Sequence, residues 1–336
     1  MTEVMDHTPR EMSLKAVRDI LPKETLLELA TKSNQQGLRQ AFFHGSLIIL
    51  AATLAEYTFH SQSVYGWYVL GLTIEAFLLS FLFMPLHECT HSTAFRNSTL
   101  NSIVGHATGF LCFRPPLHYK YYHFAHHRYT GDAEHDPELH ETGTDLKIDG
   151  ILKYVVYLSG LPFWLDRSST ILRHALKVRL ESEHYLRGRA GDRVTCEARV
   201  YLLLYIAVAL FSYATGSAFL WRVWVLPSLI GQPFLRYYLM AEHTGCQQGH
   251  NMLSNTRTTI TTPWYRALAW QMPFHAEHHA FPQIPFHALP RLHRHLSKTL
   301  AVQSKCHPTG WAGYSGFHAQ FVSKLMGIGN QGGGQR

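Results

Sequence analysis

Long stretches without charge limit this chain to a small set of folds. The 22 residues from Val200 to Trp221 contain no Asp, Glu, Lys or Arg. A helix needs about 20 apolar residues to cross the roughly 30 Å hydrocarbon layer of a bilayer. This stretch therefore predicts a membrane-spanning helix.

Other stretches have the same character. Residues 40–59 and 64–86 are apolar and are each interrupted by a single acid, and a weaker stretch covers residues 223–241. The shorter apolar stretches 103–117 and 154–165 contain proline, so we expect them to be interfacial or re-entrant segments. Because the mean hydropathy of the chain is only −0.09, a soluble helical core is the alternative. We expect an all-α integral membrane protein with about four transmembrane helices.

The distribution of basic residues sets the expected orientation. Residues 166–199 hold eight Arg or Lys against five Asp or Glu, within a formal net charge of +7. Such an excess between spans favours the cytoplasmic side of a membrane. The charge therefore fits an anionic lipid surface, and no nucleic acid partner is expected. We expect a cytosolic arm at 1–39, a membrane domain at 40–300 and a cytosolic tail at 301–336.

Histidine is unusually abundant, with 24 residues against 23 for Asp and Glu together. The five cysteines form no C-x-x-C pair, so neither a thiolate metal site nor a disulfide framework is expected. At positions 87–91 the chain reads HECTH, the H-E-x-x-H pattern in which two histidines bind zinc and the Glu is a general base. Read alone, this motif predicts a membrane zinc protease.

Two further histidine groups change this interpretation. HFAHH at 123–127 and HAEHH at 275–279 both place histidines at i, i+3 and i+4, which share one face of a helix. A catalytic zinc takes three protein ligands, so a larger set of imidazoles fits two metals. Nitrogen ligation alone leaves iron, copper, zinc and nickel open, and any one group alone could be a solvated surface cluster. The candidate ligands are His87, His91, His123, His126, His127, His275, His278 and His279.

The order of these motifs resembles the membrane fatty acid desaturase and hydroxylase superfamily. His-x-x-x-His is followed by His-x-x-His-His, then by a basic segment, two spans and a second His-x-x-His-His. The resemblance covers roughly residues 40–300. The segments HHRYTGDAEHDPEL, AEHTG, NTRTT and HAEHHAFPQIPFHALPRLH are similar to a narrower branch that includes rhizopine oxygenases and rhizobitoxine desaturases.

This resemblance implies a non-haem di-iron site on the cytosolic ends of the spanning helices. The eight histidines become iron ligands, and His243 is the candidate for a further ligand because the family has an extra histidine near the end of its last span. With O2 as co-substrate and two electrons from outside, such a site removes hydrogen from an unactivated carbon. Glu88 then loses the role of base that the short motif gave it. The electrons are expected from a separate ferredoxin or cytochrome with its reductase.

Acids close to the histidine groups are candidates for orienting them. Ligating imidazoles usually donate their second N–H to a carboxylate, and Asp132, Asp136 and Glu242 are placed for this role. Glu75 lies in an apolar stretch, where a charge is costly. It is expected to line a substrate entrance or to pair with Arg236.

The expected function is oxygen-dependent desaturation or hydroxylation of a fatty-acyl or lipid substrate. A small polar amino compound is the alternative substrate, and a membrane zinc protease is the alternative class. The expected location is the bacterial inner membrane or the endoplasmic reticulum, with the histidines on the cytosolic face. Spacing alone does not separate desaturation from hydroxylation.

Overall fold

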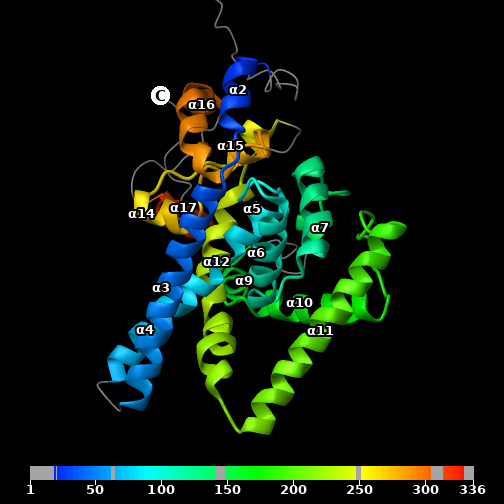
Figure 1. Cartoon of the computed structure of the whole chain (residues 1–336). Helices are drawn as coiled ribbons and strands as arrows, with labels where there is room; N and C mark the ends of the chain where they lie inside the picture. The colour runs from blue at the N-terminus through cyan, green and yellow to red at the C-terminus, as the bar shows by residue number, and fades with distance from the viewer. Residues whose placement is uncertain are drawn as a thin grey trace, which may run out of the picture.

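The computed structural model describes residues 19, 21–61, 65–140, 148–246, 251–303 and 313–328. Every element of regular structure in these residues is a helix, which agrees with the predicted all-α class (Figure 1). The predicted arm at 1–39 and tail at 301–336 therefore lie partly outside the described residues. The α-helices, the π-helix η1 and the 3₁₀ helix η2 are α2 (Lys23–Leu29), α3 (Asn34–His60), α4 (Tyr65–Ser80), α5 (Phe83–Thr90), α6 (Ser98–Leu111), α7 (Pro116–Tyr129), α8 (Pro137–His140), α9 (Ile151–Leu158), α10 (Leu161–Ala175), α11 (Arg189–Thr215), η1 (Trp221–Val225), α12 (Leu226–His243), α13 (Met252–Asn255), α14 (Pro263–Leu268), α15 (His275–Ala280), η2 (Phe286–Ala288), α16 (Leu289–Gln303) and α17 (Gly313–Leu325).

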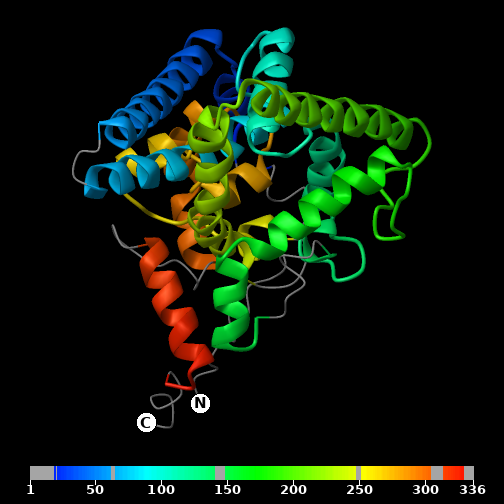
Figure 2. The ribbon, with the colours of Figure 1, turned by 90° about the horizontal axis from the view of Figure 1, so that it is seen from below.

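Two long hairpins extend from the same side of the molecule. The first is made of α3 and α4, and the second of α11 and α12 (Figure 1). Viewed from below, α12 occupies the centre, with α3 and α4 on one side of it and α11 on the other (Figure 2). The two hairpins therefore return the chain to a common end (Figure 1).

Three helical segments of the described chain are long and apolar enough to cross a membrane. They are Asn34–His60, Tyr65–Thr90 and Arg189–Thr215. The fourth predicted span, α12, is not among them, because its 18 residues include Arg236, Glu242 and buried Gln232. The protein is thus an integral membrane protein. Of the roughly four predicted spans, the described residues support three.

The long helices expose apolar side chains along their length. Phe42, Ile49 and Leu50 on α3, and Leu203 and Phe211 on α11, each have more than 60% of their surface exposed. Apolar faces of this extent are expected against lipid rather than water.

One charge pair joins the two hairpins at the end far from the histidines. The guanidinium of Arg222 binds the carboxylate of Glu56 through two bonds of 2.7 and 2.8 Å. A bidentate ion pair of this kind satisfies two charges that would otherwise be costly beside lipid.

The boundaries of the first two spans differ from the prediction. Helix α3 begins at Asn34, not at 40, because the side chain of Ser33 accepts a hydrogen bond from the backbone N–H of Gln36 and caps the helix. The second stretch is divided between α4 and α5. Pro85 lacks the N–H that a continuous helix would donate to Phe81, which accounts for the break.

The short apolar stretches and the basic segment are also helical. Residues 103–117 contribute to α6, and residues 154–165 contribute to α9 and α10. The predicted basic linker at 166–199 is the end of α10, a connecting segment and the start of α11. The main hydrophobic core lies at the common end of the hairpins and includes buried Leu86, Tyr119, Tyr238, Trp270 and Phe281.

Candidate metal centre

Five of the predicted ligands form one compact group at the common end of the hairpins. His87, His91, His123, His127 and His278 each offer a ring nitrogen, and these atoms all lie within 4.8 Å of one another. Nε2 of His123 is 2.8 Å from Nε2 of His91 and 3.0 Å from Nε2 of His127. The group draws on α5, α7 and α15.

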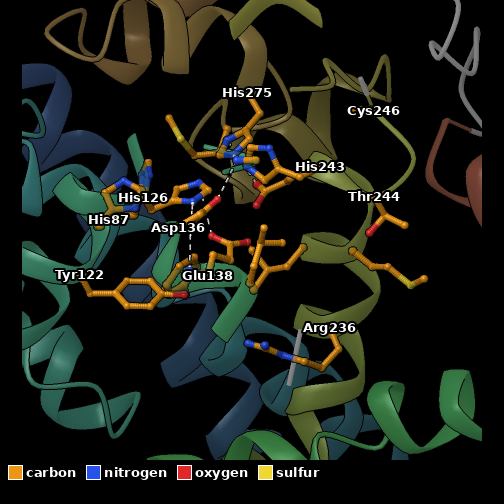
Figure 3. A pocket seen from close by; sticks show the side chains of 18 of the residues that line it. His87, Tyr122, His126, Asp136, Glu138, Arg236, His243, Thr244, Cys246 and His275 are labelled. Atoms are coloured by element: carbon orange, nitrogen blue, oxygen red, sulfur yellow. Dashed lines mark hydrogen bonds and ion pairs between the residues drawn. The ribbon is translucent and has the colours of Figure 1, made fainter. Parts of the chain in front are cut away.

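A second group lies beside the first. It contains His126, His243 and His279, whose ring nitrogens are also within 4.8 Å of one another. Nε2 of His275 is 3.3 Å from Nε2 of His243, so His275 borders this group. Figure 3 shows His126, His243 and His275 turned toward a common point. The structure thus brings all nine predicted histidines together.

The two H-x-x-H-H motifs divide their histidines between the groups. On α7, His123 and His127 belong to the first group and His126 to the second. On α15, His278 belongs to the first and His279 to the second. Consecutive residues of a helix lie about 100° apart around the axis, since a turn takes 3.6 residues, whereas residues four apart, such as His123 and His127, lie only about 40° apart. One helix can therefore supply neighbouring metals.

Several buried ring nitrogens in these groups have no hydrogen-bond partner among the described residues. Buried imidazole nitrogens are normally paired, and each exception calls for an explanation. A bound cation supplies one, because it replaces the missing partners of many nitrogens at once. The atoms are Nδ1 and Nε2 of His87, Nδ1 of His127, Nδ1 and Nε2 of His278 and Nε2 of His279.

The protonation of four of these histidines suits metal binding. Burial lowers the pKa of His123, His127, His278 and His279 well below the usual value. These imidazoles are therefore neutral, which is the form that binds metals. Burial also acts to lower the pKa of His126, but Glu138 and Asp136 outweigh it and raise that pKa to about 9.

Neighbouring oxygens hold the ligand rings in place. Nδ1 of His126 donates to Oδ1 of Asp136 at 2.9 Å, which leaves Nε2 for a metal (Figure 3). Nδ1 of His243 donates to the carbonyl of Asn255 at 3.2 Å, with the same result. Such partners fix both the tautomer and the orientation of a ligand ring.

The three predicted orienting acids differ in what they contact. Asp136 holds His126, and Oε1 of Glu242 lies 3.4 Å from Nδ1 of His275. Asp132 instead accepts from the backbone N–H groups of Glu134 and His135 at 2.9 and 3.0 Å. We therefore leave Asp132 out of the candidate centre.

Exchanging aspartate for asparagine separates these roles. We expect Asp136→Asn to lower metal affinity about 10- to 100-fold, since the amide no longer stabilises the ring of His126 in the orientation for ligation. Asp132→Asn is the matched control and should leave the affinity within about twofold of wild type. Metal content after dialysis against a graded chelator measures both, and equal behaviour of the two variants would contradict the assignment.

Two acids near the centre are not among the predicted orienting residues. Glu277 lies inside HAEHH and is fully buried, where it binds the hydroxyl of Thr258 and Nδ1 of His293. It thereby fixes the short helix α15. Oε2 of Glu138 is 3.4 Å from Nε2 of His126, on the side of the ring that faces the centre. Glu277 could have been proposed from the sequence, because it lies inside HAEHH. The position of Glu138 could not, because it depends on the turn before α8.

Two acids that the sequence singled out face away from the centre. Glu88 accepts from the hydroxyl of Thr93 at 2.8 Å and from the backbone N–H of Phe286 at 3.3 Å. Its carboxylate is therefore a packing element and not the base of a zinc protease. Glu75 lines a separate cavity with Glu56 and His60, and the structure gives no ion pair between Glu75 and Arg236.

A third buried group has metal-ligand residue types but is already hydrogen-bonded. His118, His174 and Glu183 have ligand atoms within 4.8 Å of one another. The Glu183 carboxylate accepts from His174 Nε2 and from the backbone N–H of Leu180, both at 2.8 Å, and lies 3.4 Å from Arg173. We interpret this group as an anchor for the segment between α10 and α11.

Comparison with known proteins agrees with this geometry. A sequence model of the family described as fatty acid desaturase matches residues 64–307, which include every histidine of both groups. The chain belongs to the fatty acid desaturase family. The histidine clusters of this family member fit a metal site.

Its curated relatives are distant. It is 22% identical over 313 residues to an endoplasmic reticulum omega-3 fatty acid desaturase of Nicotiana tabacum, covering 84% of this chain and 76% of that protein. It is 24% identical over 242 residues to an sn-1 oleoyl-lipid 12-desaturase of Picosynechococcus sp., covering 66% of this chain and 65% of that protein. An sn-1 acyl-lipid omega-3 desaturase (ferredoxin) of Nostoc sp. is 22% identical over 276 residues, covering 79% of this chain and 68% of that protein. The chain spans from about half to three quarters of the length of such relatives.

Proposed function

We propose that the protein is an O2-dependent di-iron desaturase or hydroxylase that acts on an unactivated C–H bond of a fatty-acyl or lipid substrate. The observation that carries the proposal is the pair of adjoining histidine groups beside one cavity. A single zinc would leave one of the two groups unused. The desaturases named among the relatives support a lipid substrate.

The chain's own residues account for much of what such a reaction needs. When bound, the iron pair supplies the activation of O2 that removes hydrogen from the substrate carbon. Asp136 and Asn255 orient the ligand rings of His126 and His243. The apolar side chains of Phe83 and Met240 line the cavity and limit the access of water to it.

The membrane setting and the partners form part of the proposal. We place the histidines on the cytosolic face, of the inner membrane in a bacterium or of the endoplasmic reticulum in a eukaryote. The region 40–300 is then the catalytic membrane domain, flanked by a cytosolic arm and tail. The electrons come from a separate ferredoxin or cytochrome with its reductase, and a ferredoxin is named for the Nostoc relative.

A small polar amino compound is the second candidate substrate. Charged side chains in the cavity lining, namely Glu138, Glu242 and Arg236, favour it over a purely hydrocarbon ligand. Profiling of lipids and polar metabolites separates the two substrates, because desaturation removes two hydrogens and hydroxylation adds one oxygen.

The purified protein tests the proposed chemistry directly. Metal analysis should return close to two irons per chain, and O2 consumption should require a reduced ferredoxin or cytochrome. Cells that express the protein should accumulate a product changed by two hydrogens or one oxygen. Zinc as the sole bound metal, together with the absence of O2 consumption, would refute the proposal.

A further inference from the structure

The cavity beside the histidines has two chemically different ends. Its volume is about 230 Å³, below the roughly 300–1,000 Å³ of sites for drug-sized ligands. His126, His243 and His275 line one end, and Arg236 lies at the other (Figure 3). Phe83, Tyr157 and Leu239 also line the cavity. The cavity therefore suits a short ligand with one polar end.

Arg236 has unused hydrogen-bonding capacity. Its side chain is 4% exposed, and its Nε and Nη2 atoms have no hydrogen-bond partner among the described residues. The carboxylate that the sequence offered as its partner, Glu75, lies in another cavity. A buried charge without a partner is costly unless a ligand supplies one.

Two more arginines lie close to Arg236. The guanidinium carbons of Arg114, Arg167 and Arg236 are 5.6, 5.5 and 4.7 Å from the centre of the same ring, Phe163. Each of the three is at most 4% exposed. Arg114 also lines the cavity. Nη2 of Arg167 lies 3.8 Å from the carboxylate of Asp166, so the positive potential for an anion at this end comes mainly from Arg236 and Arg114.

The acids of the cavity lie at its opposite end. Asp136 and Glu138 contact His126, and Glu242 contacts His275. Arg236 and His243 are seven residues apart on α12, which is two helical turns on one face and about 10 Å along the axis. The side chains of Arg236 and His243 therefore line the same cavity from positions two turns apart on α12.

We propose that Arg236, assisted by Arg114, binds the free carboxylate of the substrate and thereby places a nearby C–H bond at the metal centre. The free Nε–H and Nη2–H lie on one edge of the guanidinium, and this edge matches the two oxygens of a carboxylate. The inference rests on the proposed function and narrows its substrate to a carboxylic acid. A neutral acyl ester would leave the guanidinium without a partner.

Three eight-carbon probes test the chemistry of this end. We would titrate the iron-loaded protein in lipid nanodiscs with octanoate, methyl octanoate and octyl phosphate by calorimetry. Octanoate should bind at least about tenfold more tightly than the ester, the contribution of one charge-assisted hydrogen bond. Equal binding of octanoate and the ester would overturn the inference. Tighter binding of octyl phosphate than of octanoate would assign the site to a phosphate headgroup and would also overturn it.

Arginine variants identify the residue responsible. Arg236→Gln should bind octanoate no better than the ester, whereas Arg193→Gln, an exposed arginine on α11, should bind octanoate like wild type. The ligand-free Arg236→Gln protein should unfold at the same temperature as wild type or higher, since it loses an unpaired buried charge. A lower unfolding temperature with octanoate binding unchanged would make Arg236 a structural residue and refute the proposal.

The same preparation separates this inference from the proposed function. Arg236-dependent selection of octanoate over the ester would support the carboxylate site even in a protein that binds no iron and consumes no O2. That result would refute the proposed O2-dependent chemistry and would support the carboxylate-binding site at Arg236. Iron and O2 consumption without such selection would leave the proposed function in place and would overturn the carboxylate site.

Discussion

Replacing His278 by alanine should remove about one metal per chain and lower O2 consumption by more than 100-fold. Both ring nitrogens of His278 are buried and lack a partner among the described residues, as expected for a metal ligand. Loss of an orienting neighbour costs about 10- to 100-fold, so a larger effect distinguishes a ligand. His126→Ala should give the same result from the second histidine group.

Exposed His140 on α8 is the matched control for both variants. It belongs to neither histidine group, and its contact is with the carbonyl of Glu134. His140→Ala should keep both metals and the O2 consumption of wild type. Metal analysis and an oxygen electrode measure the outcomes. Turnover at the wild-type rate in both His126→Ala and His278→Ala would be incompatible with the proposed di-iron site.

Replacing Gly231 by alanine should destabilise the protein by about 1–3 kcal/mol, the usual cost of an added group in a packed interior. A Cβ at Gly231 would lie 2.3 Å from the carbonyl oxygen of Ala76 on α4. That atom belongs to backbone and cannot rotate away. Small residues such as glycine allow membrane helices to approach closely. With alanine at position 231, α4 and α12 would therefore have to move apart.

Replacing Gly45 by alanine should instead increase the stability of the protein. A Cβ there meets nothing within 4 Å, and Gly45 lies inside α3. Alanine in a helix interior is more stable than glycine by roughly 0.5–1 kcal/mol. Thermal unfolding in one detergent gives both values. A drop of equal size in Gly45→Ala and Gly231→Ala would mean that the clash with α4 is not responsible.

The histidine spacing predicted most of the candidate centre. Because i, i+3 and i+4 residues share a helix face, the spacing within each motif was sufficient to direct its histidines to one site. His243 was named from the family resemblance, and the structure places it in the second group. The histidines of α7 and of α15 are divided between the two groups because consecutive ligands point in different directions around the helix axis. The motif alone does not show to which group each histidine belongs.

Other features depended on contacts between distant segments. Asn255 meets His243 because the loop before α14 returns to the end of α12. Hydropathy identified the apolar stretches but not the break beside Pro85 or the polar composition of α12. The burial of Arg236 without Glu75 as a partner depends on how α4 packs on α12. No single stretch of sequence contains that information.

The histidine groups join segments that are far apart in the chain. His87 and His278 are separated by 191 residues, and α7 and α12 contribute from between them. Ions held there would act as cross-links that remove loop-closure entropy from the unfolded chain. Metal affinity would then be part of the folding free energy. Metal supply during synthesis would consequently control how much of the protein accumulates, in addition to how much of it is active.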